Sequence, residues 1–289
     1  MNDAFKHQMT EYVTFINDHL ATYFADESQP QQELFSAMRY SLLSGGKRLR
    51  GVMVLAFARL CGGDWRKAAP YAAALEMIQA YSLIHDDLPC MDDDDFRRGA
   101  PTNHKVYGEA MAVLAGDALL TAAFHTVATA PFDCNAKAVE ILAACAGELG
   151  MVGGQALDIR SEDRACTERE ILDIQTRKTG ALIRAACVLG VLAGGGDEDQ
   201  RKAASGYADH LGLAFQIRDD MLDVIGDAKV LGKATGMDTE KNTFVRLYGL
   251  EKCQELVNAH TDLALEAVRI FSNADFVKEL ARSLTQRVA

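Results

Sequence analysis

The segment from Tyr81 to Gly99 (YSLIHDDLPCMDDDDFRRG) concentrates carboxylates and then closes with two arginines. Its charged residues are Asp86, Asp87, Asp92, Asp93, Asp94, Asp95, Arg97 and Arg98. Two like charges about 4 Å apart repel by roughly 4 kcal/mol at an effective dielectric near 20, so such a cluster needs bulk water or a cation. Carboxylate oxygens suit Mg²⁺, which usually also bridges to substrate phosphates, and arginine binds phosphate bidentately. The segment therefore predicts a metal site that handles a phosphorylated substrate.

The spacing of these carboxylates decides how they could share a metal. Asp86 and Asp92 are six residues apart, which is about 600° around an ideal helix and leaves them on different faces. They can bind one cation only where the helix breaks between them, and Pro89 supplies a break. For this cluster taken alone, a solvated acidic turn or a helix cap is the alternative.

A second acidic cluster lies in the segment Phe215–Asp223 (FQIRDDMLD). Asp219 and Asp223 are four residues apart, so their side chains share one helix face and could share a cation. The surrounding residues are apolar, and an unpaired carboxylate among them would be costly. An ion pair with Arg218, or with a basic residue on another helix, is the alternative. Two Asp-rich helix ends in one chain favour paired metal sites.

Basic residues gather in five short motifs that contain glycine or lie near the acidic clusters. The motifs are GGKRLR (Gly45–Arg50), Arg97–Arg98, RKTG (Arg177–Gly180), LGK (Leu231–Lys233) and KNT (Lys241–Thr243). A single surface lysine is usually only a solvated charge. Together these motifs supply positive charge where a bound diphosphate would need it.

Long helices must position these motifs. The chain of 289 residues has 5 prolines and 7% aromatic residues, and its apolar residues recur with helical periodicity. The pattern predicts helices over residues 3–24, 34–42, 52–60, 64–87, 109–130, 136–153, 168–193 and 198–223, a charged loop over 232–242, and amphipathic helices beyond it. No alternating strand pattern is present. We therefore expect a single all-α domain over residues 1–289.

Composition excludes several classes of function. The net charge of −11 argues against a general nucleic-acid binder, which needs a basic face. The 7 cysteines include no CxxC pair, which argues against zinc sites and disulfides and for reduced thiols in the cytoplasm. The N-terminal residues lack the apolar stretch of a secretory signal, and no run of about 18 apolar residues predicts a membrane span.

The two acidic motifs, together with GGKRLR, GQALD and KTG, carry a specific resemblance. The sequence resembles the trans-prenyl diphosphate synthases over nearly its whole length, from about Leu34 onward. The long DDxxxxD form of the first motif, with Tyr81 five residues upstream, is similar to the bacterial farnesyl diphosphate synthase branch. The resemblance implies a helical bundle around a central cavity, a homodimer, and Mg²⁺-dependent condensation of isopentenyl diphosphate with an allylic diphosphate such as dimethylallyl or geranyl diphosphate.

The resemblance also implies a role for each motif residue. Mg²⁺ would be bound by Asp86, Asp92 and Asp219, supported by Asp87 and Asp223. The allylic diphosphate would be held by Arg97, Lys178, Lys233 and Lys241. Isopentenyl diphosphate would be held by Lys47, Arg50, Gln79 and Arg98. Thr179 and Gln216 would face the allylic cation with oxygen dipoles, and Asp158 would assist the metal and lysine network. The departing pyrophosphate could accept the final proton, so no histidine base is required.

Tyr81 and the adjacent Ser82 are the expected determinants of product length. In the family that the sequence resembles, a bulky aromatic side chain at this place blocks elongation, so the resemblance implies that Tyr81 stops it at the C15 farnesyl product. Five residues are about 7.5 Å of helical rise but roughly 140° of rotation from Asp86, so spacing does not decide whether Tyr81 faces the same cavity. A simple core role for Tyr81, with a C10 or C20 product, is the alternative.

Three positions depart from the usual family pattern, and two other functions compete. Gly51 stands where proline is common, Gln79 where bacterial relatives often have histidine, and Asn242 where serine or threonine is usual. A terpene cyclase would not need two acidic motifs and a second set of basic motifs. A non-catalytic regulatory homologue would be expected to have lost motif residues, and here all are present.

Overall fold

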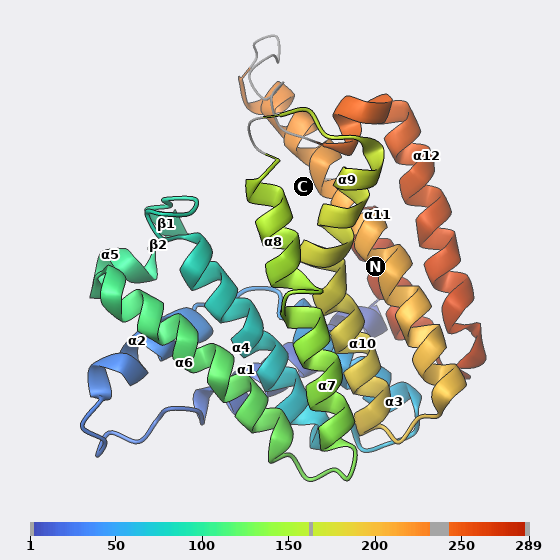
Figure 1. Cartoon of the computed structure of the whole chain (residues 1–289). Helices are drawn as coiled ribbons and strands as arrows, with labels where there is room; N and C mark the ends of the chain where they lie inside the picture. Colours follow the sequence, from blue (N-terminus) through green and yellow to red (C-terminus); the bar gives the residue numbers. More distant parts are fainter. Residues whose placement is uncertain (1–2, 162–163, 232–242, 287–289) are drawn as a thin grey trace.

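The computed structural model describes residues 3–161, 164–231 and 243–286 as a bundle of helices (Figure 1). The helices are α1 (Asp3–Ala21), α2 (Gln32–Leu42), α3 (Leu49–Leu60), η1 (Trp65–Ala68), α4 (Ala69–Asp86), α5 (Asn103–Tyr107), α6 (Glu109–Ala128), α7 (Asn135–Ala146), α8 (Met151–Ile159), α9 (Glu168–Gln175), η2 (Thr176–Gly180), α10 (Ala181–Ala193), α11 (Glu198–Leu231), α12 (Phe244–Ala267), η3 (Val268–Ile270) and α13 (Asp275–Thr285). The expected all-α class is confirmed.

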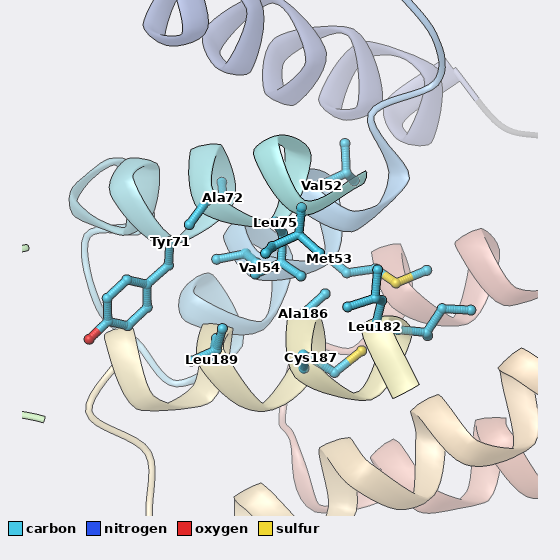
Figure 2. Packing of buried hydrophobic residues seen from close by; sticks show 14 of the residues in the cluster. Val52, Met53, Val54, Tyr71, Ala72, Leu75, Leu182, Ala186, Cys187 and Leu189 are labelled. Carbon is cyan, nitrogen blue, oxygen red and sulfur yellow. The ribbon is translucent and has the colours of Figure 1, made fainter. Parts of the chain in front are cut away.

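Helix α4 forms the centre of the bundle. Most of its side chains are apolar and buried, which is the pattern of a core helix, and its polar residues gather toward its C-terminal half. Side chains of α4 pack against those of α3 and α10, and Val54, Leu75 and Leu182 are all fully buried (Figure 2). Because this core fixes the axis of α4, it also fixes where the helix ends and where the first acidic motif begins.

The C-terminal ends of α4 and α11 point toward the same end of the bundle, with α8 between them in the view of Figure 1. Asp86 is the last residue of α4, whereas Asp219 and Asp223 lie in the C-terminal half of α11, which continues to Leu231. The arrangement therefore places the chemically interesting residues on one side of the molecule.

Several elements differ in detail from the sequence-based expectations. The expected helix 136–153 is two helices, because the backbone leaves helical geometry at Gly147 and resumes only at Met151. The segment 64–87 begins with a 3₁₀ turn, and 168–193 contains one π-helical turn, η2. The described residues also contain a hairpin of two short antiparallel strands, β1 (Phe96–Arg97) and β2 (Ala100–Pro101). Short-range turns of this kind leave no periodic signal in a sequence.

One described helix, α6, is long and apolar enough to cross a bilayer by length and composition. A single helix of this kind is weak evidence, since core helices of globular proteins meet the same test. Helix α6 packs against α4, and its Leu119 and Ala123 are fully buried. The expected absence of a membrane span stays a prediction.

Candidate active site

The first acidic motif folds back on itself where α4 ends. The helix stops at Asp86, three residues before Pro89, as the spacing argument requires. The Asp92 amide then donates a hydrogen bond to the Asp86 carbonyl at 2.8 Å, which returns the chain to the helix end. Burial raises the pKa of the Asp86 carboxyl to about 6, and the charge of Asp92 adds to the rise while Lys178 opposes it. The motif therefore holds two carboxylates close enough to repel each other.

Asp87, the next carboxylate of the motif, is paired with Arg97. Only 3% of its surface is exposed, and its Oδ1 accepts a hydrogen bond from Nε of Arg97 at 2.7 Å. Arg97 also contacts Asp94, at 3.4 Å. The Asp87 carboxylate raises the pKa of Arg97 and fixes its guanidinium. In this structure Asp87 positions Arg97. The expected role of Asp87 in supporting a metal stays a prediction.

Lys178 lies in the π-helical turn η2 and meets α8. Its Nζ is 2.5 Å from Oδ2 of Asp158, which confirms that these two residues belong to one network. The backbones of α8 and η2 approach each other closely at Gly154. A Cβ atom on this residue would lie 2.3 Å from the backbone nitrogen of Lys178. Only glycine allows this contact, and Asp158 follows one turn later on α8.

Thr179 and Gln216 are brought together across η2 and α11. The Thr179 hydroxyl donates to Oε1 of Gln216 at 3.3 Å. Nε2 of Gln216 in turn donates to Oδ1 of Asp220 at 3.2 Å. This chain of contacts joins the second acidic motif to the turn that carries Lys178.

Asp220, to which the sequence analysis gave no role, is the buried carboxylate of the second motif. Its Oδ2 accepts a hydrogen bond from the Phe244 amide at 2.8 Å, and burial raises its pKa. It joins α11 to the start of α12, so its role here is structural. Asp219 is half-buried and Asp223 exposed. Across residues 3–161, 164–231 and 243–286, no three or more Asp, Glu, His or Cys side chains lie close enough together to hold a metal.

A cavity of about 470 Å³ lies between α4, α8 and η2. Of the predicted residues, Arg50, Gln79, Tyr81, Ser82, Asp86, Lys178 and Thr179 line it. No role was assigned from the sequence to the remaining lining residues, which are Leu83, His85, Met91, Met151, Val152, Gln155, Ala156 and Ile159. Those on α8 belong to an ordinary apolar helix pattern, which gives no signal of a cavity wall. Tyr81 and Asp86 do face the same cavity, a point that spacing left open.

A second cavity of about 600 Å³ adjoins the first and is strongly basic. It is lined by Ser44, Gly46, Lys47, Arg48, Leu49, Arg50, Glu76, Gln79 and Arg98. All four residues predicted to hold the second diphosphate are therefore together, and Arg50 and Gln79 line both cavities. Nε of Arg50 is buried without a hydrogen-bond partner. Lys233 and Lys241 lie outside the described residues.

One cavity contains a carboxylate of the first acidic motif, the other is basic, and the two share a wall inside the helical bundle. This arrangement is typical of an enzyme that joins two anionic substrates. The sequence profile described as "Polyprenyl synthetase" matches residues 31–281. The chain therefore belongs to the polyprenyl synthetase family. It is a prenyltransferase that elongates prenyl diphosphates. The family acts on isopentenyl and allylic diphosphates and uses a divalent metal.

Similar proteins make products of different lengths. The chain is 45% identical over 250 residues to the farnesyl diphosphate synthase of Geobacillus stearothermophilus, covering 84% of this chain and 83% of the relative. It is 44% identical over 247 residues to the geranylgeranyl diphosphate synthase of Cyanophora paradoxa, covering 83% and 82%. A crystal structure of an FPP/GFPP synthase from Zymomonas mobilis superposes with a TM-score of 0.87 at 37% identity, covering 99% of this chain and 100% of that one.

Proposed function

We propose that this enzyme condenses isopentenyl diphosphate with dimethylallyl diphosphate and then with geranyl diphosphate, and releases farnesyl diphosphate. The observation that carries the proposal is the shared wall of the two cavities. Arg50 and Gln79 face both, so two diphosphates bound on either side would bring their hydrocarbon parts together. A site that holds both reactants in this way lowers the entropic part of the barrier.

The residues of the first cavity, between α4, α8 and η2, suit an allylic diphosphate and a divalent metal. The first motif offers only hard carboxylate oxygens, and the pKa of Asp86 is raised by burial and by the nearby Asp92. A cation relieves this repulsion, so the donor set fits Mg²⁺, with Asp86 and Asp92 as its ligands and Asp219 and Asp223 as the expected ligands from α11. When bound, Mg²⁺ supplies positive charge that stabilises the departing diphosphate.

The side chains of this chain then divide the work. Lys178 and Arg97 hold the allylic diphosphate, while Lys47, Arg50 and Arg98 hold the isopentenyl diphosphate. Thr179 and Gln216 direct oxygen dipoles toward the carbon that loses its diphosphate. Met91, Met151 and Ile159 make the cavity wall apolar, which keeps water from the allylic cation. The bond between that cation and isopentenyl diphosphate forms as a proton leaves for the released pyrophosphate.

The position of Tyr81 supports the farnesyl product. Tyr81 lines the first cavity and is only 5% exposed, so its side chain limits the space available to a growing chain. Relatives with 44 to 45% identity make either farnesyl or geranylgeranyl diphosphate, so overall similarity does not select the length. We propose C15 on the size of this side chain, with geranyl and geranylgeranyl diphosphate as the alternatives.

The test is to incubate the purified enzyme with Mg²⁺, labelled isopentenyl diphosphate and each allylic primer in turn. We expect dimethylallyl and geranyl diphosphate to be consumed and farnesyl diphosphate to accumulate, with no turnover after a chelator is added. A cyclised hydrocarbon, or no turnover with any primer, would contradict the proposal. We further propose that the enzyme works as a homodimer in the cytoplasm, which sedimentation analysis and cell fractionation would test.

A further inference from the structure

His85 stands between the cavity and helix α6. It lies four residues after Tyr81 on α4, and the two rings meet edge to face with centroids 5.7 Å apart and planes at 81°. On its other side, Nε2 of His85 lies 3.1 Å from the Val113 carbonyl of α6, to which a protonated Nε2 donates. The ring is thus held by α6 and supports the ring of Tyr81.

The imidazole of His85 can pack against α6 because residue 116 is glycine. A Cβ atom on Gly116 would lie 2.1 Å from Nε2 of His85 and 2.4 Å from its Cδ2. Carbon and nitrogen atoms cannot approach so closely, so any larger residue must displace the imidazole. Gly116 is also in the interior of a long helix, where glycine is otherwise unfavourable.

Both His85 and Tyr81 line the first cavity, between α4, α8 and η2. We propose that Gly116 and His85 are positioning residues for product length: Gly116 admits the imidazole, the imidazole holds the Tyr81 ring, and the Tyr81 ring sets the depth available to the growing chain. This inference rests on the proposed prenyl elongation. It adds residues that contact the length-determining side chain from a neighbouring helix.

The geometry gives the two residues opposite effects. His85→Ala removes atoms from the cavity wall and leaves the edge of the Tyr81 ring unsupported, so the cavity deepens. Gly116→Ala pushes the imidazole off α6, and the open space next to it is the cavity, so the cavity becomes shallower. We therefore expect longer products from His85→Ala and shorter ones from Gly116→Ala.

The experiment compares product length at equal conversion for the wild type, His85→Ala, Gly116→Ala and the double variant. From labelled isopentenyl diphosphate and dimethylallyl diphosphate, we expect the C20 to C15 ratio to rise at least about fivefold in His85→Ala. We expect the C10 to C15 ratio to rise by a similar factor, about fivefold, in Gly116→Ala. Because the double variant has no ring to clash, it should behave like His85→Ala, a non-additive result.

Matched controls separate this role from general destabilisation. Gly206→Ala on α11 adds a Cβ atom 3.7 Å from Ala267, an ordinary contact, and His125→Ala removes an exposed histidine of α6. Both should keep the wild-type product ratio. Circular dichroism reports whether each variant is folded, and His85→Ala, which creates no clash, carries the test where Gly116→Ala fails to fold.

The outcomes distinguish the two proposals. A wild type that forms no prenyl diphosphate would contradict the proposed function. A wild type that elongates, together with an unchanged product ratio in folded His85→Ala, would contradict only this inference. Additive behaviour of the double variant would contradict the contact between Gly116 and His85 as its cause.

Discussion

The Nζ atom of Lys178 lies 2.5 Å from Oδ2 of Asp158, although the two residues belong to different elements, η2 and α8. The same lysine is close enough to Asp86 to oppose the rise in its pKa. Asp158 therefore neutralises and orients a cation that stands next to the first acidic motif. Because both side chains are partly exposed, the pair contributes little to folding, and its importance lies in where it holds the ammonium group.

Asp158→Asn should weaken the hold on Lys178 without changing the shape of the site. We expect kcat/KM for the allylic diphosphate to fall about 10 to 100-fold, as is typical when a residue that orients a charged group is lost. Steady-state kinetics with geranyl diphosphate measures it. Asp173→Asn, on the exposed side of α9, is the control and should leave the kinetics unchanged. Equal losses in both variants would contradict a specific role for Asp158.

The sequence predicted most of the helices, because helical periodicity is local, and Pro89 marks the end of α4 at the first acidic motif. The predicted helix end at Asp223 was wrong, since α11 continues to Leu231. The four residues assigned to isopentenyl diphosphate line one cavity. Lys47, Arg50 and Arg98 lie in short basic motifs, and the family resemblance supplied the place of Gln79 as well, so these positions needed no knowledge of the packing.

Contacts between elements that are distant in the chain could not be predicted from the sequence. The ion pair of Asp87 with Arg97 depends on how the β1–β2 hairpin folds over the end of α4. The close approach at Gly154 depends on how α8 packs on η2. Neither leaves a periodic pattern, and a DD pair looks the same whether one or both carboxylates face the cavity. The relation of Asp219 to Asp86 stays a prediction, since the cavity lining includes Asp86 alone of the two.

Asp86→Asn should separate stability from function. Burial raises the pKa of this carboxyl to about 6, so its ionised form at pH 7.5 opposes folding. We expect the metal-free variant to gain about 1 kcal/mol in free energy of unfolding, a figure reduced for the solvent that reaches the group. Activity should fall at least about 1,000-fold, because the amide is a poor replacement for an anionic metal ligand.

Urea denaturation without metal and single-turnover kinetics with Mg²⁺ measure the two effects of Asp86→Asn. Asp93→Asn is the comparison, since Asp93 is an exposed residue of the same motif. It should change the stability by less than about 0.5 kcal/mol. Loss of both stability and activity in Asp86→Asn would show that this carboxylate is structural.

Two adjacent glycines offer a paired test of the basic cavity. Gly46 has a φ of +108°, and a Cβ atom there would lie 2.8 Å from Cζ of Arg98. Gly45 has a φ of +83°, with no atom within 4 Å of the corresponding position. Gly46→Ala should raise KM for isopentenyl diphosphate about tenfold, because it displaces the Arg98 guanidinium. Gly45→Ala should cost only about 1 kcal/mol of stability through backbone strain.

Varying each substrate separately decides the glycine test. A Gly46→Ala effect confined to isopentenyl diphosphate is expected, since Arg98 lines the basic cavity and not the first cavity. An equal rise in KM for both substrates, or the same rise in Gly45→Ala, would contradict the assignment of Arg98.

The paired imidazoles of His210 and His260 should make stability depend on pH. Their Nδ1 atoms are 3.1 Å apart between α11 and α12, and burial, with His210 as a second cause, lowers the pKa of His260 below 6.5. A histidine with a lowered pKa in the folded state binds fewer protons than in the unfolded chain. Its contribution to stability is therefore complete above pH 6.5 and is lost as the pH falls toward the folded pKa.

His260→Gln removes this titration and keeps a polar side chain at the contact. Urea denaturation at pH 7.5 and pH 5.5 should show a smaller loss of stability on acidification in the variant than in the wild type. His125→Gln, on the exposed side of α6, should retain the wild-type loss. Because Asp86 and the other carboxylates titrate equally in all three proteins, the difference between them isolates the histidine pair. Identical losses of stability in His260→Gln and the wild type would mean that the histidine pair between α11 and α12 does not contribute to the pH dependence of folding.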